Sequence, residues 1–222
     1  MSVAENLKKV IATIDAVKRE PVTLTAVTKN HGVEVMREAI DAGVENIGEN
    51  RIQEAIEKFE TLDRQVTKHL IGHLQTNKVK PAVKNFDLIH SVDSIHLAES
   101  LNKAALAAGK IQDILIQVNL AKEDSKSGIY EEDLPELVAA VEEMKNLRLR
   151  GLMTIAPNFP DVENCRPLFR KMRKIFDEMK ATRKNFDFLS MGMTHDYKIA
   201  VEEGSNMVRV GTAIFGERNY NV

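Results

Sequence analysis

Residues 22–47 read VTLTAVTKNHGVEVMREAIDAGVENI, and this stretch shows the pattern that decides the fold. Val22–Val27 is a short apolar run with β-branched residues, which is typical of a strand. Apolar residues recur at helical spacing through Val33–Asp41, and Val44–Ile47 is a second short apolar run. A helix between two such runs predicts a right-handed βαβ unit in a parallel sheet.

The same alternation of strands and helices runs through the rest of the chain. The further predicted strands are His69–Ile71, Asp87–Ser91, Asp113–Asn119, Arg148–Met153, Phe188–Met191 and Met207–Val210. The further predicted helices include Asn50–Phe59, Ile95–Ala108, Leu134–Met144 and Val162–Met179. Before the first strand, Leu7, Val10, Ile11, Ile14 and Val17 recur at helical spacing and Pro21 marks the stop of a helix.

Eight strands that alternate with helices predict an α/β fold, a closed (β/α)8 TIM barrel. An open doubly wound sheet would give the same local pattern, so that alternative stays open. No low-complexity or Pro/Gly-rich linker divides the chain, which predicts a single domain over residues 1–222. The opening helix would complete the outer ring, and 222 residues are slightly few beside the roughly 250 that are typical.

Composition excludes several classes of function. The formal net charge is -2 and the pI is about 6.3, so no global basic field exists to attract nucleic acid or an anionic membrane. One cysteine, Cys165, excludes an intramolecular disulfide and a cysteine metal cluster. The sequence has neither an apolar run of about 18 residues nor a signal-peptide pattern at its start. We therefore expect a soluble cytoplasmic protein.

The functional face of a barrel is built by the loops that follow the strands. Lys29 follows the apolar run Leu24–Thr28, where a buried ammonium is costly unless it is paired or neutralised. Burial lowers the pKa of a lysine, and the neutral amine attacks aldehydes, so Lys29 is a candidate Schiff-base lysine. The alternative is an exposed lysine at a strand end.

Two C-terminal segments, Ser190–Thr194 and Gly204–Thr212, surround the last two strands. In barrels these loops often bind phosphate through backbone N–H groups and a short extra helix, which Ala213–Gly216 can supply. The alternative is a pair of ordinary tight turns. Because the first and last strands of a closed barrel are neighbours, a lysine on one and a phosphate site on the other suit a phosphorylated aldehyde.

Six motifs carry a family resemblance in order along the chain. They are AVTK (26–29), IGENRIQE (47–54), HLIGHLQTNK (69–78), GLM (151–153), LSMGMTHD (189–196) and VRVGTAIFGER (208–218). They resemble the pyridoxal phosphate homeostasis protein family, also called the proline synthetase co-transcribed homologue family. Its fold resembles the N-terminal barrel of alanine racemase. Two departures are Asn30-His31 after the lysine and Thr194 in place of a serine.

The resemblance implies a role for each of six residues toward pyridoxal 5′-phosphate (PLP). Lys29 is similar to the lysine that forms the internal aldimine, and Arg209 to the arginine that faces the pyridine nitrogen. Asn50 is similar to a residue lining the pocket. The implied phosphate ligands are Ser190, Gly211 and Thr212.

Arg209 bears on whether the cofactor is activated. Arginine donates to the ring nitrogen and cannot accept from it, which leaves the ring unprotonated and a poor electron sink. A racemase with an arginine partner still needs a second acid–base group. In alanine racemase a tyrosine from another domain of the other subunit does this. The chain ends at Val222, where we expect no such domain, and Tyr130, Tyr197 and Tyr220 have no obvious place over the cofactor.

We therefore predict a PLP binder and carrier, not an enzyme, that acts in PLP homeostasis and in amino-acid and keto-acid balance. The alternatives are a weak or narrow PLP-dependent racemase and a scaffold protein with a vestigial site. The expected partners are PLP and, as candidate recipients, PLP-dependent apo-enzymes. We expect no nucleic acid, membrane or metal partner, and a monomer.

Other chemical signals favour structural roles. His69 and His73 flank a strand, so their spacing does not suit a metal pair. His31 and His195 are interpreted as solvent-exposed loop histidines. The basic residues from Arg166 to Lys174 form the solvated side of a helix, and Cys165 is interpreted as buried or inert. The polar segment Lys122–Gly128 is a hypothetical lid.

Overall fold

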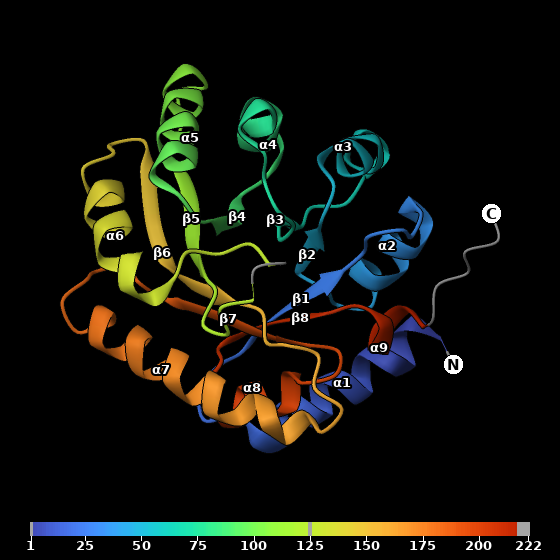
Figure 1. Ribbon diagram of the computed structural model, residues 1–222. Coiled ribbons are helices and arrows are strands. Elements are labelled where there is room, and N and C mark those ends of the chain that lie inside the picture. Colours follow the sequence, from blue (N-terminus) through green and yellow to red (C-terminus); the bar gives the residue numbers. More distant parts are fainter. Residues whose placement is uncertain (1, 124–125, 217–222) are drawn as a thin grey trace.

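The computed structural model describes residues 2–123 and 126–216, and these form a closed barrel of parallel strands surrounded by helices (Figure 1). The strands are β1 Thr23–Val27, β2 Asn46–Glu49, β3 Thr67–Leu70, β4 Leu88–Val92, β5 Gln112–Val118, β6 Leu147–Thr154, β7 Phe188–Met193 and β8 Met207–Val210. They pair in chain order, and β8 closes the barrel on β1 with Thr25 beside Arg209. The barrel is confirmed, and the open sheet is excluded.

Helices follow the strands around the outside of the barrel. They are α1 Val3–Val17, α2 Val33–Asp41, α3 Ile52–Thr61, α4 Val79–Asn85, α5 Ile95–Ala107, α6 Leu134–Glu142, α7 Arg166–Lys180, α8 Tyr197–Glu202 and α9 Thr212–Phe215. Short 3-10 turns, Thr76–Lys78, Glu131–Asp133 and Val162–Cys165, precede α4, α6 and α7. The predicted helix Val162–Met179 is therefore a 3-10 turn followed by an α-helix.

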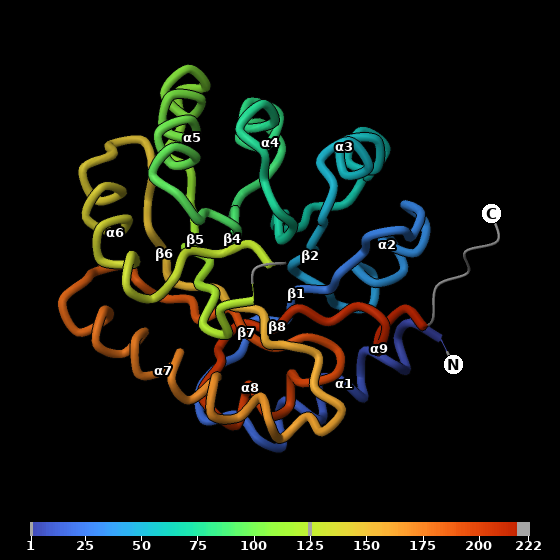
Figure 2. Tube along the Cα trace, viewed as in Figure 1, coloured from blue at the N-terminus to red at the C-terminus, as the bar shows by residue number. Residues whose placement is uncertain are grey.

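Helix α1 occupies the place in the outer ring that was expected of it. Its first turn has a capping box, in which Ser2 and Glu5 bond each other's backbone N–H groups. Leu7, Val10 and Ile14 are buried, and α1 contacts α2, α8 and α9. Figure 2 shows α1 beside α8 and α9. The buried side chains of α1 thus pack in one cluster with Ala26 of β1 and with Val208 and Val210 of β8.

Side chains alternate between the barrel interior and the surrounding helices, as the period of a strand requires. On β8, Val208 and Val210 join the apolar layer under the helices, whereas Met207 belongs to a separate small cluster. That cluster also contains Leu88, Leu115 and Met153. These four side chains fill one layer of the interior, and polar side chains fill the space nearer the carboxyl ends of the strands.

A bulge in β7 shapes the functional end of the barrel. Ser190 pairs with Met207, but Met193 pairs with Arg209, so β7 has one residue more than β8 over this interval. Gly192 has φ +96°, and a Cβ there would lie 2.6 Å from the Cβ of Ala200. Only glycine fits this conformation without displacement. The bulge turns the residues that follow, including Thr194, toward the mouth of the barrel.

Candidate ligand-binding site at the mouth of the barrel

A cavity of about 350 Å³ opens where the strands end, which is the expected functional face of a barrel. Its lining is Val27, Lys29, His31, Asn50, Ile71, Ile155, Met193, Thr194, His195, Arg209, Gly211 and Thr212. The structure thus brings together five of the six residues predicted to bind the cofactor. The volume lies within the range of about 300–1,000 Å³ that small-molecule sites occupy.

Lys29 follows Val27, the last residue of β1, and Thr28, which are both buried. Lys29 itself is half-buried. The backbone on both sides of Lys29 is held. The Thr28 carbonyl accepts a hydrogen bond from Lys58 Nζ at 2.9 Å, and the Asn30 N–H donates to Glu54 Oε1 at 2.5 Å. Asn30 has φ +62°, a left-handed conformation that asparagine tolerates better than most residues. The lysine therefore stands on a fixed turn.

A buried ion cluster stands behind this turn. Lys58 Nζ contacts Glu49 Oε1 at 2.8 Å and Glu54 Oε1 at 2.6 Å, and Thr28 Oγ1 donates to Glu49 Oε1 at 2.6 Å. Burial raises the pKa of the fully buried Glu49, against the effect of Lys58 and Thr28. Burial also tends to raise the pKa of Glu54. Hydrogen bonds from Lys58 and from the Asn30 N–H outweigh this effect, so the pKa of Glu54 is lowered.

The loops that follow β7 and β8 place hydrogen-bonding groups at the cavity. The Gly211 N–H donates to Thr194 Oγ1 at 3.2 Å, which joins the two loops. Helix α9 begins at Thr212, and the first amides of a helix have no acceptor within it. Asp196 holds the Thr194 loop by accepting the Met193 N–H at 2.6 Å. Burial raises the pKa of Asp196, whereas this N–H and Arg209 oppose the shift.

Arg209 lines the cavity yet is only 3% exposed. Its NH1 group donates to Ser190 Oγ at 2.6 Å and its NH2 group to the Thr154 carbonyl at 2.9 Å. Burial lowers the pKa of the guanidinium to about 10, with Asp196 acting in the opposite direction. Arg209 is therefore protonated at neutral pH and can only donate.

Ser190 is the one predicted ligand that does not reach the cavity. It is fully buried, and its hydroxyl contacts Arg209 and His90. The β7 bulge explains the difference, because it lies between Ser190 and the loop that faces the mouth. The hydroxyl at the cavity belongs to Thr194, which the sequence shows in place of the family's second serine.

Asn50 has a feature that points to a ligand. Its Oδ1 atom is buried and has no partner within the described ranges 2–123 and 126–216. Gly72 lies against it so closely that a Cβ on Gly72 would be 2.3 Å from the Asn50 carbonyl oxygen. Glycine at position 72 thus keeps Asn50 beside the cavity, where a polar ligand can satisfy the orphaned amide.

The chain matches the alanine racemase N-terminal domain family over residues 2–219. The pyridoxal phosphate homeostasis protein of Aquifex aeolicus is 43% identical over 199 residues, which are 89% of this chain and 87% of that protein. The protein of the same name from Pseudomonas aeruginosa is 39% identical, over 99% of this chain and 97% of that one. This chain belongs to the pyridoxal phosphate homeostasis protein family.

Solved structures agree with this family assignment. PipY of Synechococcus elongatus, with PLP bound, matches with a TM-score of 0.87 and 38% identity, over 97% of this chain and 100% of that chain. An alanine racemase of Clostridium difficile matches with a TM-score of 0.75 but only 17% identity, over 98% of this chain and 61% of that chain. The second likeness shows the fold alone, and the predicted likeness to the alanine racemase barrel is confirmed.

The histidines of this family member differ in part from their interpretation as exposed loop residues. His195 is exposed at the rim of the cavity, as expected. His31 is half-buried and its ring lies 5.0 Å from that of Phe215, so its interpretation as a solvent-exposed side chain is wrong. No group of three or more His, Cys, Asp or Glu side chains in the described part of the chain is placed to hold a metal ion.

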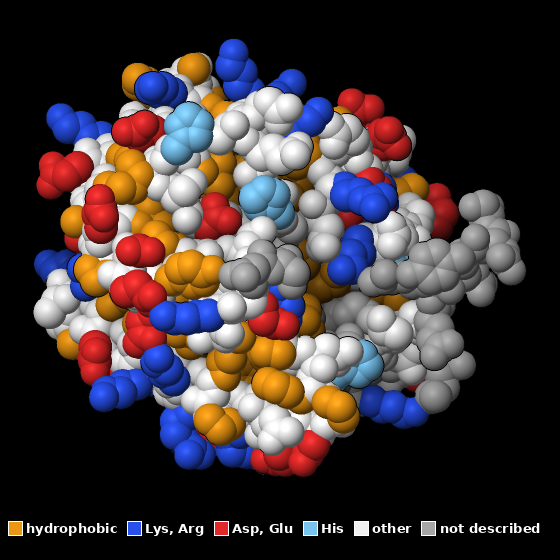
Figure 3. Space-filling model, viewed as in Figure 1, with side chains coloured by type: hydrophobic (Ala, Val, Ile, Leu, Met, Phe, Trp, Pro, Cys, Tyr) orange, Lys and Arg blue, Asp and Glu red, His pale blue; other side chains and the backbone are white. Residues whose placement is uncertain are grey.

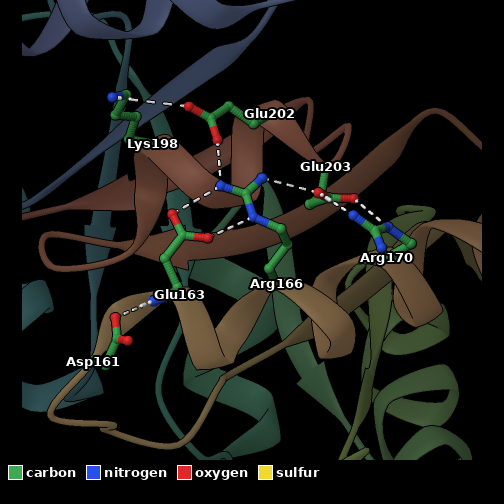
Figure 4. Close-up of polar contacts among 7 residues, drawn as sticks. All are labelled: Asp161, Glu163, Arg166, Arg170, Lys198, Glu202 and Glu203. Carbon is green, nitrogen blue, oxygen red and sulfur yellow. Dashed lines mark hydrogen bonds and ion pairs between the residues drawn. The ribbon is translucent and has the colours of Figure 1, made fainter.

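The basic side of α7 in this family member is neutralised by carboxylates. Arg166 bonds Glu163, Glu202 and Glu203, and Arg170 also bonds Glu203 (Figure 4). Over the face drawn in Figure 3, acidic and basic side chains are interspersed. The expectation that these charges are a solvated helix side is confirmed, and their pairing disfavours a nucleic-acid surface.

Two further predicted features are the inert Cys165 and the hypothetical lid. Cys165 is 2% exposed, and burial raises the pKa of its thiol to about 11, which agrees with an unreactive cysteine. Part of the Lys122–Gly128 segment, residues 124–125, and also Tyr220 lie outside the described residues. The lid therefore stays a prediction.

Among the described residues, no helix has the length and apolar character needed to cross a bilayer.

Proposed function

We propose that this protein binds PLP in the cavity at the mouth of the barrel, with Lys29 as the covalent attachment point. The observation that carries the proposal is that Lys29, Arg209 and the Thr194–Gly211 pair line one cavity. When bound, PLP supplies an aldehyde that condenses with a primary amine. The PLP-bound structure of the relative PipY supports the same ligand for this chain.

The polar groups of the cavity fit the parts of this cofactor. We infer that the Thr194 hydroxyl and the amides at Gly211 and Thr212 bind the phosphate, because the Gly211 N–H already donates to Thr194 and leaves its hydroxyl proton to donate, and because Thr212 begins helix α9. Arg209 donates to the pyridine nitrogen. Asn50, whose Oδ1 lacks a partner in the described chain, accepts from the cofactor or its ordered water. Ser190 acts only through Arg209.

The role that fits this arrangement is storage and supply of PLP, not catalysis. Arg209 donates to the ring nitrogen and does not protonate it, so the ring remains a poor electron sink. The described tyrosines, Tyr130 and Tyr197, do not line the cavity. The names of the relatives, pyridoxal phosphate homeostasis proteins, support the same role. We further propose that the protein acts as a cytoplasmic monomer and passes PLP to PLP-dependent apo-enzymes.

Absorbance titration with PLP tests the binding. The wild-type protein should give a saturable visible band, whereas Lys29→Arg should keep the positive charge and lose the band. Lys84→Arg is the matched control, since Lys84 is exposed on α4 and does not line the cavity. A band of equal strength in Lys29→Arg would contradict the assignment, and no band in the wild type would favour the scaffold alternative.

Exchange of substrate α-protons with heavy water tests the racemase alternative. The PLP-loaded protein should exchange the α-proton of amino acids no faster than free PLP does. Exchange that is faster than free PLP and lost in Lys29→Arg would establish catalysis and overturn the carrier role.

A further inference from the structure

A chain of buried polar side chains crosses the barrel interior and ends at Arg209. Ser190 Oγ accepts from Arg209 NH1 at 2.6 Å and lies 3.1 Å from His90 Nδ1. His90 Nε2 is 2.9 Å from His69 Nδ1, and His69 Nε2 is 3.1 Å from Asn46 Oδ1. The five residues come from β8, β7, β4, β3 and β2.

Burial keeps both histidines of this hydrogen-bond chain, His69 and His90, neutral. His69 is 2% exposed and His90 is fully buried. Burial lowers the pKa of His69 to about 4, and it lowers that of His90 well below the usual value, with smaller contributions from His69 and Arg209. A neutral imidazole has one N–H and one acceptor nitrogen, so each ring relays one hydrogen bond in a fixed direction.

One order of donors gives the Ser190 hydroxyl and both imidazole rings a donor and an acceptor along these contacts. Arg209 can only donate, and within residues 2–123 and 126–216 the Ser190 hydroxyl has two side-chain partners. The hydroxyl therefore accepts from Arg209 and donates to His90 Nδ1. His90 Nε2–H then donates to His69 Nδ1, and His69 Nε2–H donates to Asn46 Oδ1. In the reverse order the Ser190 hydroxyl proton would have no acceptor, which is costly in a dry interior.

We propose that His90, acting through Ser190, is a positioning residue that orients the Arg209 guanidinium toward the ring of a bound cofactor. This inference rests on the proposed PLP site. In Arg209, the NH1 group is held by Ser190 of the hydrogen-bond chain, and the NH2 group is held by the Thr154 carbonyl. The remaining N–H groups of Arg209 are available to the cavity that it lines. Two anchors on a planar group fix its plane as well as its position.

The direction of the chain can be measured without any cofactor. Nitrogen chemical shifts of the imidazole rings in the wild-type protein should show both His69 and His90 neutral at pH 7 and protonated at Nε2. Protonation of either ring at Nδ1, or of both nitrogens, would overturn the donor order. The surface residue His96 provides the reference signal for an exposed ring.

The effect on Arg209 is tested with matched variants titrated with PLP. His90→Leu and Ser190→Ala each break the chain beside Arg209 and should weaken PLP binding about tenfold, the scale of one lost hydrogen bond to a charged group. They should also shift the absorbance maximum of bound PLP. His90→Gln keeps an acceptor for Ser190 and a donor for His69, and should bind within about threefold of the wild type.

A control at a buried serine that is not part of the hydrogen-bond chain distinguishes loss of Arg209 positioning from general loss of stability. The Ser205 hydroxyl lies within hydrogen-bond distance of the carbonyls of Leu189, Met191 and Met207 and can donate to one of them, so Ser205→Ala should lower the melting temperature and leave the PLP spectrum unchanged. Unchanged affinity and spectrum in folded His90→Leu and Ser190→Ala would overturn the inference. Absence of PLP binding by the wild type would instead remove the proposed function itself, and the inference with it.

Discussion

Lys58 Nζ donates to the Thr28 carbonyl at 2.9 Å, one residue before Lys29, and so ties helix α3 to the backbone that carries the proposed attachment point. The same ammonium contacts Glu49 and Glu54, and Glu54 accepts the N–H of Asn30. Two side chains on α3, those of Lys58 and Glu54, thus hold the peptide groups on either side of Lys29. Placement of the amine depends on a buried ion cluster that does not itself line the cavity.

Removing the Lys58 ammonium should lower the stability of the protein. Lys58→Met leaves Glu49 buried without its cation and should lower the free energy of unfolding by about 3 kcal/mol. Urea denaturation measures this loss, and Lys84→Met, at an exposed position on α4, is the control. The second substitution Glu49→Gln removes the stranded charge and should restore part of the loss. Equal stability of Lys58→Met and Lys84→Met would contradict this role.

The neutral histidines make stability depend on pH. His69 has a folded pKa of about 4 against an ordinary value of 6.5, so the unfolded chain binds more protons between these values. Stability is therefore full above pH 6.5 and falls as the pH drops toward 4, by about 1.4 kcal/mol per pH unit for each such histidine. Comparing His69→Gln with the exposed control His96→Gln isolates this contribution. Only His69→Gln should flatten the slope, and parallel curves would disprove the assignment.

The Thr194 hydroxyl should distinguish phosphorylated from unphosphorylated ligand. Thr194→Val removes the hydroxyl at nearly constant volume and should weaken PLP binding about tenfold. Binding of pyridoxal, which lacks the phosphate, should change little. Thr194→Ser keeps the hydroxyl and should behave as the wild type does. Equal weakening of both ligands by Thr194→Val would show that the residue does not contact the phosphate.

The β7 bulge should require glycine at position 192 for reasons of space as well as conformation. Gly192 and Gly43 both have positive φ, at +96° and +105°, but only Gly192 has atoms within contact distance of an added Cβ. Gly43→Ala should therefore cost about 1 kcal/mol, and Gly192→Ala clearly more. Thermal unfolding of the two variants measures the difference. Equal melting temperatures would mean that the bulge accommodates a side chain.

The barrel was predictable because its signal is repeated and local. Each strand is a short apolar run, and β8 even coincides with its predicted bounds, Met207–Val210. The same local reasoning indicates Lys29 and the segment with Gly211 and Thr212, because each stands at or near the end of a strand, whereas the role of Arg209 comes from the family resemblance. Family resemblance supplied Asn50. These residues line one cavity because parallel strands end at the same face.

What the sequence did not indicate depends on register and on distant partners. Ser190 stays a predicted ligand from the resemblance, but a bulge cannot be recognised from one strand alone, and only the structure shows Thr194 at the cavity beyond the β7 bulge. His90 went unnoticed because its partners, Ser190 and His69, lie on other strands. The one available signal was the presence of these polar residues inside predicted apolar strands. Lys58 appeared as an ordinary helix residue until tertiary structure brought it to Thr28.

Reduction of the PLP complex with borohydride, followed by mass spectrometry of the labelled peptide, tests most directly whether Lys29 holds the cofactor. We expect one stoichiometric label, at Lys29, and its loss in Lys29→Arg. A label that lies at Lys58 or Lys126, or is spread over surface lysines, would show that the amine at the end of β1 does not hold the cofactor.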